Sequence, residues 1–73
     1  MENIYTWAKK NFPHPINNAI IEEIIFSDNP RNFIEVGREF SRTRQAIQYR
    51  YKKIMKKLQT QFAEDQQLEL NKR

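Results

Sequence analysis

The stretch Ser41 to Leu58, SRTRQAIQYRYKKIMKKL, combines an apolar helical stripe with a high density of positive charge. Its apolar residues recur every three or four positions, which places them on one side of an α-helix: Ile47, Tyr51, Ile54 and Leu58. The same stretch holds seven of the thirteen Lys and Arg residues and none of the nine Asp and Glu residues. The seven cations are Arg42, Arg44, Arg50, Lys52, Lys53, Lys56 and Lys57. Such a helix packs through one face and offers cations on the other, as helices that read the DNA major groove do.

The composition limits the architecture around this helix. With 73 residues the chain has room for one domain, near the lower size at which a hydrophobic core alone holds a fold. The chain has no cysteine and one histidine, which excludes a disulfide framework and a Cys/His zinc site. We therefore expect neither a metal nor another cofactor.

The charge distribution favours a polyanionic partner. The formal net charge is +4, and every unit of this excess comes from residues 41–58. No apolar run approaches the roughly 18 residues of a membrane span, and the N-terminus lacks the apolar core of a signal peptide. We expect an intracellular protein without a membrane partner.

Prolines divide the N-terminal part of the chain into helices. The Pro-His-Pro run at residues 13–15 interrupts any helix begun by residues 3–11. Pro15 is well placed as the first residue of a second helix, which we expect to run to about Phe26. No alternating pattern predicts a strand, so the fold class is all-α.

A second break precedes the basic helix. Asn29 can cap a helix that begins at Pro30. The apolar residues that follow share one helical face: Phe33, Val36, Gly37 and Phe40. A glycine within a helix costs about 1 kcal/mol relative to alanine, so Gly37 suggests that the basic helix passes close to it. The short connection predicts a tight helix-turn-helix, with Thr43 or Ser41 as the cap of the last helix.

The expected architecture is a three-helix bundle over residues 15–58, with a possible extra helix in residues 1–12. Residues 59–73 are expected to extend the last helix by a turn or two and then fray. Trp7 and Phe12 could lie over the bundle on the N-terminal helix. Alternatively Trp7, Phe12 and Phe62, with Leu70, could dock a protein partner or a second copy of the chain, and the sequence leaves both alternatives open.

The polar face of the basic helix carries the candidate functional residues. At about 100° per residue, Tyr49 and Lys53 point away from the apolar stripe and Gln48 lies at the edge of the outward face. Cations near the helix start could clamp a phosphate. The candidate DNA-binding residues are Arg42, Arg44, Gln45, Gln48, Tyr49, Lys52, Lys53 and Lys56.

A merely solvated face is the alternative explanation of this charge. Solvated helix faces usually mix both signs in i,i+4 pairs, whereas this segment has no acid. Tyr49 has its own alternative, which is packing against Trp7 or Phe12 of the N-terminal segment.

Catalytic chemistry is not indicated. His14 stands between two prolines and is expected to be a turn residue. Glu22 and Glu23 are adjacent on a helix, so they point about 100° apart and do not form a carboxylate pair. Because no Ser, Thr or His pattern supports nucleophilic catalysis and no glycine-rich phosphate loop exists, we do not expect an enzyme.

The order of residues from Phe33 to Met55 resembles the second half of a Myb/SANT-type domain, within the homeodomain-like helix-turn-helix superfamily. The features of the family pattern are, in order, an aromatic residue, Ile-Ala three residues on, Leu, Arg-Thr, a small residue followed by an aliphatic one, and a last aromatic residue. They stand here as Phe33, Val36-Gly37, Phe40, Arg42-Thr43, Ala46-Ile47 and Tyr51. The resemblance covers roughly residues 16–58.

This resemblance implies a double-stranded DNA-binding module that uses its third helix in the major groove, within a dimer or larger complex. It implies base contacts by Gln48, Tyr49 and Lys52, with Arg44, Gln45 and Lys53 near the DNA backbone. Phe33 and Tyr51 would replace two of the three core tryptophans of the family. The implied location is the nucleus, or the cell interior of a prokaryote or a virus-infected host.

Some features depart from the family pattern. The opening Trp and its acidic cluster are missing, the loop before Arg42 is one residue shorter, and the usual base-reading Asn is absent, so no target sequence follows. Other family members bind histone tails or other proteins. The rival expectation is therefore a SANT-type protein-interaction module of a chromatin or DNA-modifying complex, with little DNA affinity of its own.

Overall fold

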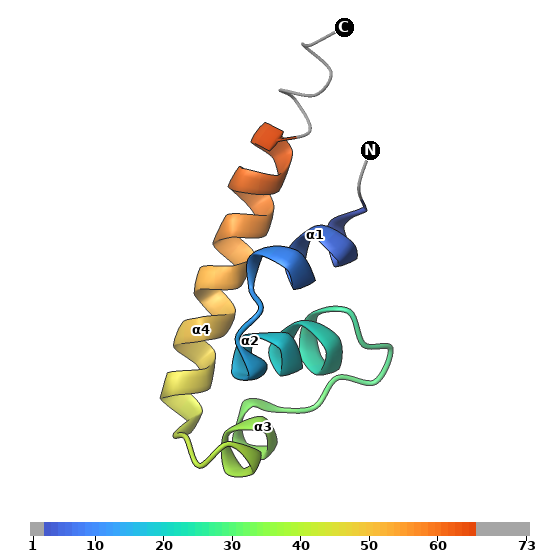
Figure 1. Ribbon diagram of the computed structural model, residues 1–73. Helices are drawn as coiled ribbons and strands as arrows, with labels where there is room; N and C mark the ends of the chain where they lie inside the picture. The colour runs from blue at the N-terminus through green and yellow to red at the C-terminus, as the bar shows by residue number, and fades with distance from the viewer. Residues whose placement is uncertain (1–2, 66–73) are drawn as a thin grey trace, which may run out of the picture.

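Every regular element of the computed structural model, which describes residues 3–65, is a helix (Figure 1). The elements are α1 (Ile4–Asn11), α2 (Pro15–Ile20), the π-helical turn η1 (Ile21–Ile25), α3 (Phe33–Glu39), α4 (Arg44–Lys57) and the π-helical turn η2 (Leu58–Phe62). The all-α prediction is confirmed for these residues. The predicted fraying of the C-terminal tail lies outside them, as does Leu70.

Side-chain caps begin the helices at positions that the sequence explains. The Asn3 carboxamide accepts the Thr6 N–H at 2.8 Å, and His14 Nδ1 accepts the Ile16 N–H at 3.2 Å. His14 therefore caps α2 within the Pro-His-Pro turn. The hydroxyl of Thr43 accepts the Ala46 N–H at 3.1 Å, so Thr43, and not Ser41, caps α4.

The predicted start of the third segment at Asn29 and Pro30 is wrong, because α3 begins at Phe33. Asn32 provides its cap by accepting the Glu35 N–H at 2.8 Å. The Arg31 N–H instead donates to the Glu23 carbonyl at 3.0 Å, which folds the loop back onto η1.

Arg31 also ties this loop to both neighbouring helices. Its guanidinium lies 2.5 Å from the Glu23 carboxylate, 2.6 Å from Glu39 and 3.5 Å from Glu35. Hydrogen bonds from the guanidinium to the carboxylate of Glu23, and to a smaller extent to that of Glu39, raise the pKa of Arg31. The loop is thus held by charge as well as by the backbone.

The core forms where the apolar stripe of α4 meets the other helices. Ile47 and Ile54 are almost fully buried, and they pack with Ile20, Ile21 and Val36. α4 runs along one side of the bundle, where it contacts α3 and α2, whereas α1 contacts η1 and η2 (Figure 1). Trp7 and Ala8 of α1 are buried, as expected for the alternative in which the N-terminal helix packs on the other helices.

Gly37 is the point of closest approach between α3 and the turn that leads to α4. A Cβ atom there would lie 2.6 Å from the Arg42 carbonyl oxygen, closer than such atoms can approach. The Arg42 N–H donates to the Gly37 carbonyl at 2.8 Å, and Ser41 adopts a left-handed φ of 55°. These features form a Schellman-type helix end, which reverses the chain within a few residues. The predicted close passage at Gly37 is confirmed, although the nearest atom belongs to the turn before α4.

Substitution Gly37→Ala tests this approach. Alanine is the better helix former by about 1 kcal/mol, yet we expect Gly37→Ala to lower the free energy of unfolding by about 2 kcal/mol, because the added methyl group displaces the turn. Urea unfolding followed by circular dichroism measures the change. Arg38→Ala, at an exposed position of the same helix, is the control and should change stability by less than about 0.5 kcal/mol. A Gly37→Ala protein as stable as the parent would contradict the close approach.

Candidate functional site

The outward side of α4 carries most of the predicted functional residues. Those exposed on α4 are Arg44, Gln45, Tyr49, Lys52, Lys53 and Lys56. Gln48 is half-buried, in agreement with its predicted place at the edge of this face. At about 100° per residue, these side chains other than Arg44 lie within an arc of about 140° opposite the apolar stripe. Gln48 lies at one edge of this arc and Lys53 at the other. We call this arc the outward face of α4; its members are Gln45, Gln48, Tyr49, Lys52, Lys53 and Lys56.

Tyr49 stands out on this face because its side chain is 63% exposed. The predicted alternative, packing against Trp7 or Phe12, is therefore wrong. The Lys53 ammonium lies over the Tyr49 ring, 5.2 Å from its centroid, a cation–π contact that also holds the ring beside the helix. Aromatic and cationic groups are thus presented together.

The turn before α4 adds positive charge at one end of the outward face. Arg42 and Arg44 flank the capping residue Thr43, and both side chains are exposed. Cations at a helix N-terminus oppose the helix dipole by some tenths of a kcal/mol each. Within residues 3–65 no ion pair involves a cation of this turn or of α4, so no carboxylate of these residues neutralises this charge by direct pairing.

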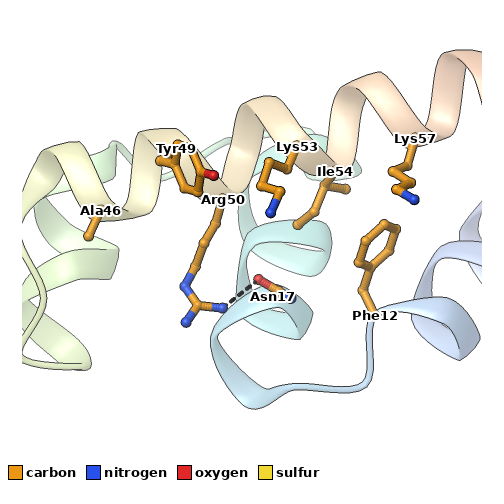
Figure 2. Close-up of a pocket in the computed structure, with 8 residues that line it drawn as sticks. All are labelled: Phe12, Asn17, Ala46, Tyr49, Arg50, Lys53, Ile54 and Lys57. Carbon is orange, nitrogen blue, oxygen red and sulfur yellow. Dashed lines mark hydrogen bonds between the residues drawn. The ribbon is translucent and has the colours of Figure 1, made fainter.

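A groove of about 540 Å³ adjoins the outward face, between α4 and the α1–α2 connection (Figure 2). It is lined by Phe12, Asn17, Ala46, Tyr49, Arg50, Lys53, Ile54 and Lys57. Figure 2 shows Arg50 reaching from α4 toward α2, where its guanidinium donates to the Asn17 side-chain carbonyl at 3.1 Å. The Phe12 ring points toward α4 from the opposite wall.

Six of these lining residues were not among the predicted DNA-binding residues, although Phe12 was predicted as a possible partner contact: Phe12, Asn17, Ala46, Arg50, Ile54 and Lys57. Arg50 and Lys57 were counted as cations, but they lie on the flank of α4 and not on its outward face. Helical spacing could have found them, since residues 46, 50, 53 and 57 share that flank. The opposite wall could not have been found, because only the tertiary fold brings Phe12 and Asn17 beside α4.

The aromatic residues predicted to dock a partner instead pack against one another. Trp7 is 5% exposed, and its ring centroid lies 5.6 Å from that of Phe62 and 6.5 Å from that of Phe12. Its indole N–H donates to the Asp65 carboxylate at 2.9 Å. Trp7 is thus buried within the chain, where its ring fixes α1 to the end of the long helix. Phe12 and Phe62 are half-buried in the same cluster.

Metal-binding clusters and membrane-spanning helices are absent from residues 3–65. This part of the chain contains no cluster of three or more His, Cys, Asp or Glu side chains that could hold a metal ion. None of its helices is long and apolar enough to cross a membrane. On the far side of the bundle, Glu22 accepts hydrogen bonds from Lys9 and from Tyr5, and these bonds lower the pKa of its carboxyl group.

Comparison of the chain with protein-family models, with curated proteins and with solved structures found no match in any of the three.

Substitution Trp7→Phe tests whether this ring belongs to the core. We expect it to lower the free energy of unfolding by about 1 to 2 kcal/mol, because the smaller ring leaves a void and Asp65 loses its donor. Thermal or urea unfolding of the isolated protein measures the effect. The control Tyr5→Phe, at a ring that is 40% exposed, should change stability by less than about 0.5 kcal/mol. Unchanged stability of Trp7→Phe would instead favour a partner-facing ring.

Proposed function

We propose that this protein binds double-stranded DNA, with α4 lying in the major groove. The finer fold that we propose is a three-helix homeodomain/Myb-like bundle built from the α2–η1 segment, α3 and α4, with α1 as an additional helix. Acting on DNA, the protein would work in the nucleus, or inside the cell if it is prokaryotic or viral. A dimer or a larger complex would supply further affinity.

The observation that carries the proposal is the unbroken positive charge of an exposed helix face. From Phe40 to Ala63 the sequence contains no Asp or Glu, and the carboxylates of Glu22, Glu23 and Glu39 lie on other elements, where they pair with Lys9 or Arg31. A face selected only for solubility would mix both signs. A face that neutralises phosphates gains affinity from each cation by releasing counterions.

The apolar stripe and the turn support the same proposal. Ile47 and Ile54 anchor α4 along its length, so the opposite side projects from the bundle on a rigid element. The tight turn at Ser41 keeps Arg42 near the start of α4. Gln45 and Gln48 offer amides that can pair with adenine, and Lys52 can contact a guanine edge.

The rival function, a SANT-type protein-interaction module, has weaker support. An exposed apolar patch on the terminal segments would support this function, but the rings of Trp7, Phe12 and Phe62 pack against one another. Of the other large apolar side chains that are exposed, Ile4 and Tyr5 are adjacent on α1, whereas Ile34 on α3 and Tyr49 on α4 lie on separate elements. Charge therefore favours DNA over a protein partner.

A salt titration of duplex binding tests the proposal. If four to six phosphates are neutralised, log K should fall with log[salt] at a slope of about −4 to −5. Lys53→Gln should reduce the magnitude of this slope by about one, because it removes one ammonium group from the DNA phosphates. Lys10→Gln makes the same charge change at an exposed position of α1 and should leave the slope unchanged. Absence of measurable duplex binding at low salt would refute the proposed function.

A second measurement separates base contacts from backbone contacts. We expect Lys53→Ala to weaken binding to all duplex sequences alike, because an ammonium on phosphate carries no sequence information. Gln48→Ala or Tyr49→Ala should alter preference at one position by about 1 to 3 kcal/mol. Binding to a randomised duplex pool, followed by sequencing, reports both effects. Equal effects of all three substitutions on every sequence would leave only non-specific binding.

A further inference from the structure

The groove beside α4 combines aromatic, apolar and cationic groups in a way that the duplex-binding face does not require. Three cations line it, Arg50, Lys53 and Lys57, and none of the described lining residues is acidic. Its apolar surface comes from Ala46 and Ile54 and from the aromatic rings of Phe12 and Tyr49. A ligand that fills this groove should therefore carry both negative charge and a flat or apolar group.

The cations form a row along one flank of α4. They recur at every third or fourth residue, so consecutive positions are about 4.5 to 6 Å apart along the helix axis. A row of this kind tracks the backbone of a polyanionic strand, whereas a single anion needs convergent groups. Arg50 is fixed by its bond of 3.1 Å to Asn17, so the row begins at an ordered guanidinium.

The aromatic groups supply what a nucleic-acid base needs. The Tyr49 ring is 63% exposed at the rim of the groove, with the Lys53 ammonium over it, and Phe12 stands on the opposite wall (Figure 2). Bases stack on such rings without sequence preference when the strand is single. A base in a duplex is already stacked and paired, so it cannot enter a recess.

We propose that the groove between α4 and the α1–α2 connection binds an unpaired nucleotide of a nucleic-acid strand. Its base lies against Tyr49 at the rim of the groove, and its flanking phosphates lie along Arg50, Lys53 and Lys57. The groove volume of about 540 Å³ falls within the range of about 300 to 1,000 Å³ typical of small-ligand sites. This inference rests on the proposed function, from which it takes nucleic acid as the class of partner. It adds that the nucleotide bound in the groove is unpaired.

A matched pair of charge substitutions on α4 tests the site. Lys57 lines the groove, whereas Lys52 lies on the outward face and is absent from the groove lining. Both side chains are exposed, so Lys57→Gln and Lys52→Gln should retain the fold, which circular dichroism verifies. The probe is a fluorescent oligothymidine of about eight nucleotides, within the usual site size of single-strand binders.

We expect Lys57→Gln to weaken oligothymidine binding about fivefold and Lys52→Gln to weaken it less than twofold. Tyr49→Leu, which keeps an apolar side chain but cannot stack, should weaken it about tenfold. In NMR spectra of the parent protein, the Asn17 side-chain amide should shift on addition of oligothymidine, because it lies in the groove and away from the outward face. Equal losses for Lys52→Gln and Lys57→Gln, or no shift at Asn17, would overturn the inference.

Two further probes separate this inference from the proposed function. A duplex of similar length should bind with the opposite ranking, Lys52→Gln being the more damaging substitution. Duplex binding without oligothymidine binding would refute the groove site and leave the proposed function intact, whereas the reverse would refute the proposed function alone. An oligoglutamate peptide of the same length should bind more weakly than oligothymidine. Tighter peptide binding that depends on Lys57 would overturn the groove site in favour of an acidic protein partner.

Discussion

The close approach of Gly37 to the Arg42 carbonyl is the constraint on which the rest of the structure depends. Because no Cβ atom intervenes, α3 can end in a tight left-handed turn at Ser41 and the chain can enter α4 almost at once. Thr43 then caps α4 at a set position. That position directs Ile47 into the core, and therefore determines which side of α4 faces solvent.

Charge is separated in space as well as in sequence. Arg31 gathers Glu23, Glu35 and Glu39 on one side of the bundle, and Lys9 neutralises Glu22 nearby. These exposed pairs add little stability individually. Their more important effect is that the acids are occupied away from α4, so the positive potential of its outward face and flank is not cancelled by adjacent carboxylates.

The outward face and the groove share Tyr49 and Lys53, so the two proposed contacts are neighbours on one helix. A DNA site with an unpaired nucleotide beside a duplex could meet both surfaces together. The Trp7 cluster bears on this arrangement, because it fixes α1 against η2 and thereby holds Phe12 in the wall of the groove. The tryptophan that looked like a partner contact in the sequence acts within the chain as a support for the groove.

The sequence by itself determined the all-α class, the apolar stripe of α4, a cap at Thr43 or Ser41 and the cationic outward face, because each depends on local spacing and composition. The sequence pattern predicted the start of α3 too early, at Pro30. The Arg31 N–H donates instead to the Glu23 carbonyl, and Asn32 provides the cap. Only the tertiary structure decided the burial of Trp7 and the opposite wall of the groove. A π turn takes more residues than an α turn, so η2 changes the face that Phe62 occupies in a way that a 3.6-residue period cannot anticipate. Contacts between residues far apart in the chain, such as Arg50 with Asn17, arise from packing and leave no local pattern to read.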